Sequence, residues 1–252
     1  MENLANYFNQ YINQKRIVVT GGTTGIGKAI AELLVSLGGR VIIFGRDEND
    51  FNHAMEDIKT KSSSGEIYGV TADITSKKDI DLVWDKVDSL LGGIDIVINN
   101  AALPARGIIE GDYDDWKYIL ETNILGYIAF AKEAVNRMKE QKSGHIVNIG
   151  SMSAEVKEKT GVIYVATKTA IRGFSTALRK EINPLGIKVS HVEPGAVTSD
   201  MQPDPKEVQE EKIEKMEMLE AEDIAMSVLF CLSQPKRCDI VSMQVRPHLQ
   251  II

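Results

Sequence analysis

The sequence contains few cysteines and no long apolar run. Its two cysteines, Cys231 and Cys238, lack the spacing of metal ligands and have no partner cluster, so we expect free thiols in a reducing compartment and no metal site. No apolar stretch reaches the roughly 18–20 residues of a membrane-spanning helix. The first residues also lack the basic and apolar segments of a signal peptide. These absences favour a cytoplasmic protein that does not cross a membrane.

Positive charge is also scarce. The 252 residues include 29 lysines and arginines against 36 aspartates and glutamates, which gives a formal net charge of −7. No local basic patch is visible, so neither a nucleic acid nor an anionic membrane is expected as the main partner. The hydrophobic fraction of 43% is ordinary for a globular protein, and a chain of this length can bury a large core without disulfides.

Short β-branched runs alternate with amphipathic helical patterns along the chain. The first 15 residues predict either a small amphipathic helix or a frayed terminus. Strands are predicted at 16–20, 40–45, 66–74, 94–100, 145–149, 188–193 and 238–246. Helices are predicted at 28–38, within 47–65, and at 76–91, 112–140, 163–183 and 221–234. No internal repeat or domain break interrupts this order.

A tyrosine and a lysine stand four residues apart in the sequence YVATK, as Tyr164 and Lys168. In a helix this spacing places both side chains on one face. A free tyrosine has a pKa of about 10, and a fixed ammonium nearby would lower that pKa. The pair is therefore a candidate acid/base device, although the pattern alone also fits a packed tyrosine beside a solvated lysine.

A glycine-rich turn, Gly21-x-x-x-Gly25-x-Gly27, joins the first predicted strand to the following helix. Glycines there let backbone N–H groups approach a pyrophosphate, and the helix N-terminus adds partial positive charge. Preceded by Thr20, this spacing resembles that of the short-chain dehydrogenase/reductase family.

Further motifs of that family follow in order over residues 16–246. Asn100 and Ala101 resemble its NNAG pattern, and Ser151 precedes Tyr164 by the usual interval. Pro194 and Gly195 begin a stretch similar to its PG-x-V-x-T pattern. The resemblance implies a single Rossmann-like domain over 1–252, doubly wound, with about seven parallel strands flanked by helices. It also implies a substrate lid at 196–220.

The end of the second predicted strand bears on the choice of cofactor. Gly45 stands where NAD-binding relatives carry a carboxylate, and Arg46 follows with a guanidinium suited to the 2′-phosphate of NADP. We therefore expect NADP(H), with NAD(H) possible because Asp47 could bind a ribose instead. The resemblance implies the following cofactor-binding residues: Gly21, Thr23, Thr24, Gly25, Ile26, Gly27, Arg46, Asp73, Ile74, Asn100, Ala101, Tyr164, Lys168, Pro194, Gly195, Val197 and Thr198, with Ser199 as an alternative to Thr198.

The activity implied is hydride transfer between NADP(H) and a small ketone, aldehyde or secondary alcohol, as in carbonyl reductases. Tyr164 would act as general acid or base, Ser151 would orient the substrate oxygen, and Ser153 is the alternative serine. Lys168 would lower the pKa of the tyrosine and bind the nicotinamide ribose. Asn123 would mark a helix distortion that supports a water relay. A non-catalytic NADP-binding regulator and an epimerase or dehydratase are the alternatives.

Family members commonly form homotetramers or dimers through the two long helices predicted at 112–140 and 163–183. Tyr127, Phe130 and Phe174 lie on these helices. Their side chains fit either such an interface or the core of the domain.

Overall fold

Parallel strands form the centre of the computed structural model, which describes residues 4–62, 64–105, 107–159, 161–199, 201–202 and 204–250. Within these residues seven strands form one sheet in the order β3-β2-β1-β4-β5-β6-β7, and every pairing is parallel. The strands are β1 (Arg16–Thr20), β2 (Arg40–Gly45), β3 (Glu66–Thr71), β4 (Ile96–Asn99), β5 (Gly144–Ile149), β6 (Ile187–Pro194) and β7 (Ser242–Val245). The predicted Rossmann-like sheet of about seven parallel strands is confirmed.

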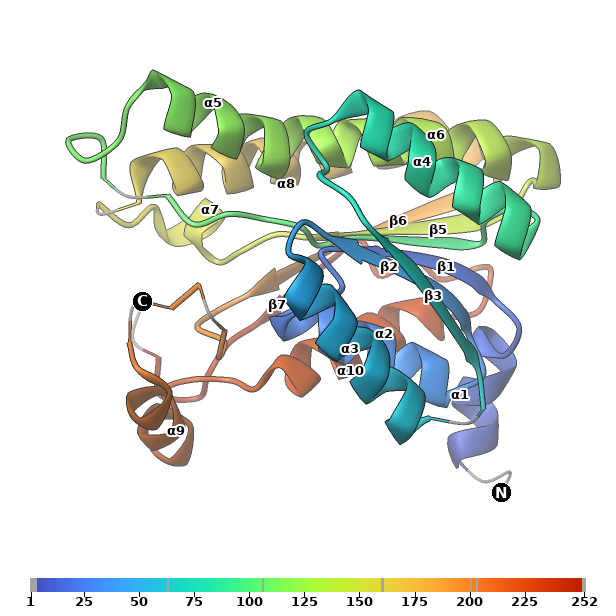
Figure 1. Ribbon diagram of the computed structural model, residues 1–252, viewed down its shortest axis with the longest axis horizontal. Helices are drawn as coiled ribbons and strands as arrows, with labels where there is room; N and C mark the ends of the chain where they lie inside the picture. Colours follow the sequence, from blue (N-terminus) through green and yellow to red (C-terminus); the bar gives the residue numbers. More distant parts are fainter. Residues whose placement is uncertain are drawn as a thin grey trace.

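Helices cover both faces of this sheet (Figure 1). One face carries α1 (Leu4–Ile12), α2 (Gly25–Ser36), α3 (Glu48–Lys61) and α10 (Ala221–Leu232). The other carries α4 (Lys77–Lys86), α6 (Gly126–Gln141) and α8 (Val162–Ile182). The remaining segments are α5 (Tyr113–Leu120), α7 (Ser153–Val156) and α9 (Lys206–Glu214), the π-helical turns η1 (Val87–Leu91) and η2 (Glu121–Leu125), and the 3₁₀ turn η3 (Asn183–Leu185). Among the described residues no helix is both long and apolar enough to cross a membrane.

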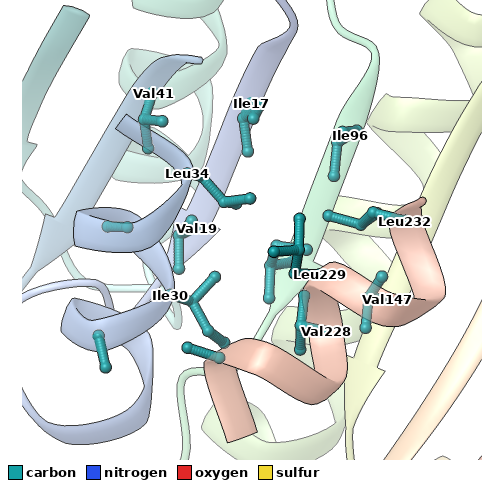
Figure 2. Packing of buried hydrophobic residues seen from close by; sticks show 14 of the residues in the cluster. Ile17, Val19, Ile30, Leu34, Val41, Ile96, Val147, Val228, Leu229 and Leu232 are labelled. Carbon is teal, nitrogen blue, oxygen red and sulfur yellow. The ribbon is translucent and has the colours of Figure 1, made fainter. Parts of the chain in front are cut away.

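Two hydrophobic layers hold the helices to the sheet, because successive side chains of a strand point to opposite faces. In β1, Ile17 and Val19 join the cluster under α2 and α10, whereas Val18 joins the cluster under α4, α6 and α8. Figure 2 shows the first cluster, in which Ile30 and Leu34 of α2 lie beside residues of the neighbouring helix α10 on the same face of the sheet. Both faces being buried explains why the strands read as continuous apolar runs.

The strand order reverses direction between β1 and β4. The chain builds outward from β1 through β2 to β3, and then returns to place β4 on the other side of β1. In parallel sheets such a switch point opens a crevice at the carboxyl ends of the strands. The loops after β1, β4, β5 and β6 therefore meet at one edge of the sheet.

Several predicted boundaries differ from the structure. The strand predicted at 66–74 ends at Thr71, because Asp73 turns the chain by accepting hydrogen bonds from Thr75. The last strand covers only 242–245. The helix predicted at 76–91 turns π-helical at Val87. The first 15 residues do contain a helix, α1, although residues 1–3 lie outside the described part.

Of the two alternatives left open for the aromatic residues of the long helices, the structure shows the core. Tyr127 and Phe130 are fully buried in the core, and the ring of Phe130 stacks on that of Phe44. Phe174 is half-buried and packs against the same cluster. These aromatic side chains therefore stabilise the packing of α6 and α8 on the sheet.

Candidate active site

The glycine turn after β1 is shaped by close approaches that a side chain would block. Gly21 and Gly25 adopt positive φ angles of 61° and 48°. A Cβ on Gly27 would lie 2.1 Å from the carbonyl oxygen of Gly21 and 2.5 Å from Nδ2 of Asn100. The turn is thus pressed against the loop after β4, and the N–H of Gly22 ties it to β2 by donating to the carbonyl of Phe44 at 3.2 Å.

Thr20 ties this turn to the loop after β4. Its Oγ1 accepts hydrogen bonds from the backbone N–H groups of Asn100 and Ala101, each at 2.9 Å. The side-chain amide of Asn100 in turn donates to the carbonyl of Gly21 at 3.1 Å. The predicted residues of both motifs are therefore held together by direct contacts.

Tyr164 and Lys168 lie on the same side of α8, at the end of β5. The ammonium nitrogen of Lys168 lies 5.5 Å from the centre of the Tyr164 ring. It donates to the carbonyl of Ile149 at 3.1 Å, and the Tyr127 hydroxyl donates to the same carbonyl at 3.0 Å. Lys168 is only 2% exposed. The predicted spacing on one helix face is confirmed, and the lysine is deeply buried.

The expected lowering of the Tyr164 pKa is not found. Burial raises the pKa of Tyr164 to about 12, while a hydrogen bond with Ser151 lowers it and the charge of Glu158 raises it. Burial also lowers the pKa of Lys168 to about 8. Desolvation is the largest cause of the Tyr164 shift, although Tyr164 keeps partial exposure and only Lys168 is almost completely removed from water. The phenol is therefore protonated at neutral pH.

The two candidate serines have different environments. Ser151 lies close enough to Tyr164 to lower the pKa of that phenol, and its Oγ donates to Oγ of Ser153 at 3.1 Å. Ser153 donates onward to Oε1 of Glu158 at 3.1 Å. The geometry thus favours Ser151 as the serine beside the tyrosine. Ser153 connects that pair to a carboxylate on the charged loop after α7.

Asn123 lies in the π-helical turn η2, which divides the single predicted helix into α5 and α6. Its side chain is 0% exposed. It donates to the carbonyl of Leu103 at 2.9 Å and accepts from the N–H of Leu103 at 2.7 Å. It also donates to the Thr167 hydroxyl at 3.3 Å, next to Lys168. The predicted local distortion is present, and Asn123 in it joins the loop after β4 to α8.

A cavity of about 190 Å³ lies beyond the glycine turn, beside the end of β2. Predicted residues Gly21, Thr23, Thr24, Arg46, Asp73, Ile74 and Ala101 are among those lining it. Asp47 lines it as well, but its Oδ1 caps α3 by accepting from the N–H groups of Asn49 and Asp50. The cap uses Oδ1 and leaves Oδ2 without a hydrogen bond to the described residues, so the alternative that Asp47 binds a ribose stays open.

A larger cavity of about 540 Å³ lies between the glycine turn and α9. Both Thr198 and Ser199 line it, so the structure leaves either hydroxyl available. The side chain of Val197 belongs to the hydrophobic core. Gly195 donates to the carbonyl of Val245 at 2.7 Å, which fixes the Pro194–Gly195 turn against β7. Within the predicted lid, residues 200 and 203 lie outside the described residues.

Comparisons with known proteins agree with this arrangement. Residues 15–210 match the family described as short chain dehydrogenase. The chain belongs to the short-chain dehydrogenase family. An uncharacterized oxidoreductase of Staphylococcus aureus (strain MRSA252) is 34% identical over 241 residues, covering 94% of this chain and 98% of the relative.

Solved structures of other short-chain dehydrogenases share the fold. One from Mycobacterium ulcerans superposes with a TM-score of 0.83 at 24% identity, covering 94% of this chain and 90% of that one. One from Burkholderia cenocepacia, in complex with NADP, gives a TM-score of 0.80 at 27% identity and covers 94% and 98% of the two chains. This short-chain dehydrogenase is therefore an oxidoreductase of a family that uses nicotinamide cofactors.

Sequence reasoning missed several residues that shape the site of this dehydrogenase. Tyr127 shares the Ile149 carbonyl with Lys168, and Thr167 contacts Asn123. Tyr118 contacts both Arg46 and Asp73 at the smaller cavity. A four-residue spacing connects Tyr118 to Thr122, which lines that cavity, and this is the only sequence signal that could have identified it.

Proposed function

We propose that this dehydrogenase is an NADP(H)-dependent carbonyl reductase that acts on a small ketone, aldehyde or secondary alcohol. The observation that carries the proposal is the convergence of Tyr164, Ser151 and Lys168 at the end of β5, beside the crevice at the strand ends. Bound in that crevice, NADP(H) would supply or accept the hydride.

The residues of the chain would handle the proton and the substrate oxygen. In the reductive direction Tyr164 donates its proton to the oxygen of the carbonyl, and its raised pKa keeps that proton in place at neutral pH. Ser151 donates a hydrogen bond to the same oxygen and orients it. In the oxidative direction the phenolate of Tyr164 accepts the proton of the alcohol.

Lys168 and Asn123 would have supporting roles in this chemistry. Lys168 places a positive charge near the phenol, which favours the phenolate as it forms, and it would bind the ribose hydroxyls of the cofactor. Asn123 links the loop after β4 to Thr167 of α8 by hydrogen bonds to both. We propose that Asn123 also supports a proton path to solvent.

The glycine turn and the smaller cavity fit the adenosine half of the cofactor. At Gly25 a Cβ would have Ser199 as its only neighbour within 4 Å, at 3.6 Å, so the backbone there is uncovered and a pyrophosphate can approach it. Arg46 lies at the end of β2, where a guanidinium suits a 2′-phosphate, and this supports NADP(H) over NAD(H).

We further propose that the chain self-associates into a dimer or tetramer. The solvent side of α8 carries small, exposed residues that permit close helix packing, among them Ala166, Ala170 and Gly173. A Cβ on Gly173 would meet no atom within 4 Å, so a second helix can approach there. In the same proposal the segment around α9 closes over the substrate.

The test of the proposal is the substitution Tyr164→Phe, assayed with a panel of ketones and aldehydes by NADPH absorbance. We expect turnover to fall by about 10²- to 10⁴-fold, because the ring remains but the proton is gone. Binding of NADPH, measured by fluorescence, should stay within about threefold of wild type because the glycine turn is unchanged.

Matched serine substitutions sharpen this test. Ser151→Ala should lower kcat far more than Ser153→Ala, since Ser151 is the serine that lowers the pKa of Tyr164. Turnover by Tyr164→Phe at the wild-type rate would refute the proposed role. Cofactor binding without net oxidation on any substrate would instead indicate a non-catalytic protein or an isomerising enzyme.

A further inference from the structure

A hydrogen-bonded chain of three side chains spans the rim of the smaller cavity. The guanidinium of Arg46 donates to the hydroxyl of Tyr118 at 2.6 Å. That hydroxyl donates to Oδ2 of Asp73 at 2.7 Å. The guanidinium also lies 5.4 Å from the centre of the Tyr118 ring. A phenol can accept one hydrogen bond while donating another, so this residue is suited to join a cation to a carboxylate.

The charges around this cavity make the position of Arg46 important. Among the described residues that line it, Arg46 is the only cation, whereas Asp47, Asp50 and Asp73 are carboxylates. Arg46 itself is exposed, and an exposed arginine beside several carboxylates has many alternative partners. A 2′-phosphate would be repelled by the carboxylates unless the guanidinium were held in place.

Tyr118 comes from a different part of the chain than the residues it holds. It lies on α5, which packs against the catalytic region through η2, and Thr122 one turn later lines the cavity. The opposite end of the chain of contacts is fixed too, because Oδ1 of Asp73 accepts from the N–H and hydroxyl of Thr75. Although partial burial opposes ionisation, hydrogen bonds from Thr75 and Tyr118 keep the pKa of Asp73 below its ordinary value.

We propose that Tyr118 is a specificity-determining positioning residue that holds Arg46 for the 2′-phosphate of NADP(H). The inference rests on the proposed preference for NADP(H) and names the residue through which Arg46 achieves it. One of the five guanidinium N–H donors of Arg46 bonds to Tyr118, and the others remain available to phosphate oxygens. Tyr118 also joins the 2′-phosphate subsite to Asp73, which the family resemblance implies to be a cofactor-binding residue.

The experiment measures binding of two probes to the full chain by calorimetry, adenosine 2′,5′-bisphosphate and 5′-AMP. They share the adenosine and the 5′-phosphate and differ only in the 2′-phosphate. The ratio of their dissociation constants therefore reports recognition of the 2′-phosphate without any contribution from catalysis. In wild type we expect the bisphosphate to bind at least about tenfold more tightly.

Three variants and a matched control separate the possible outcomes. Arg46→Ala should bring the ratio close to one. Tyr118→Phe should lower the ratio by about three- to tenfold while binding of 5′-AMP stays near wild type. The double variant should show no loss beyond Arg46→Ala, because the tyrosine acts only through the arginine. Tyr113→Phe is the control, since Tyr113 lies on the same helix, is 75% exposed and makes no side-chain hydrogen bond with the described residues.

Each contrary result would show which step of the proposal is wrong. A wild-type ratio near one that Arg46→Ala does not change would refute the preference for NADP(H), and the inference with it. If the ratio of dissociation constants falls to about one in Arg46→Ala but does not change in Tyr118→Phe, the role of Tyr118 alone is refuted. Equal weakening of both probes in Tyr118→Phe, or a loss that adds to that of Arg46→Ala, would indicate a merely structural residue. Thermal melting of each variant confirms that the compared proteins are folded.

Discussion

Burial of the Lys168 ammonium lowers the free energy of unfolding, and the substitution Lys168→Met would measure by how much. The ammonium is 2% exposed, and burial lowers its pKa to about 8 from the ordinary 10.5. Carrying the charge at neutral pH therefore costs about 3 kcal/mol relative to the unfolded chain. Methionine fills a similar volume without a charge. The lost hydrogen bond to Ile149 offsets about 1–2 kcal/mol of the gain, and the Ile149 carbonyl keeps its bond from Tyr127.

We therefore expect Lys168→Met to be inactive yet more stable than wild type, by about 1–2 kcal/mol at pH 7. For a chain of this size that corresponds to a melting temperature higher by about 4 °C. The measurement is chemical and thermal unfolding of the cofactor-free protein. Lys180→Met is the matched control, because Lys180 is exposed on the same helix, and it should change stability by no more than about 0.5 kcal/mol.

The pH dependence gives the decisive check. Below pH 8 both the folded and the unfolded wild type carry the charge on Lys168, so the full cost is present. Between pH 8 and 10.5 the folded protein releases this proton while the unfolded chain keeps it, so wild-type stability rises with pH. Between pH 7 and 9.5 wild type should gain about 2 kcal/mol that the methionine variant lacks. A variant that is less stable at pH 7, or a stability difference that stays constant over this range, would refute the reasoning.

Two further substitutions test the surroundings of the site. Glu158→Gln removes a charge that raises the pKa of Tyr164, so the limb on which alcohol oxidation rises with pH should move to lower pH. A rising limb that stays in place or moves to higher pH would contradict this. Gln209→Leu removes the side-chain amide that accepts from the N–H of Ser199 at 3.1 Å and donates to the carbonyl of Asp204 at 2.8 Å. With these bonds lost, NADPH should bind several-fold more weakly and limited proteolysis should cut faster before α9, whereas unchanged cleavage and affinity would show that the bonds do not order this segment.

The elements of the fold were predictable because both faces of the sheet are buried. Continuous apolar runs marked β1 and β2 with correct boundaries, and the glycine turn between strand and helix indicated where a nucleotide would lie. The four-residue spacing placed Tyr164 and Lys168 on one helix face, as found. These features depend on local sequence, and local sequence was sufficient for them.

Other features depend on contacts between distant residues and could not be read from local patterns. The π-helical turn at Asn123 is held by Leu103, 20 residues earlier, and by Thr167, 44 residues later. Arg46 and Tyr118 are 72 residues apart in the chain. The direction of the Tyr164 pKa shift was mistaken because the sequence shows which residues are neighbours but not how far each is removed from water.

The carbonyl of Ile149 shows how these long-range contacts assemble one site. It lies at the end of β5 and accepts hydrogen bonds from Tyr127 on α6 and from Lys168 on α8. Burial raises the pKa of the Tyr127 phenol well beyond its usual range, so this group remains a neutral donor, and the charged donor beside it is the lysine. The buried ammonium is costly by itself, and the large apolar clusters on both faces of the sheet supply the stability that offsets it. A charge this unfavourable for folding is expected to persist only where it serves chemistry, which is why the stability of Lys168→Met bears directly on the proposed function.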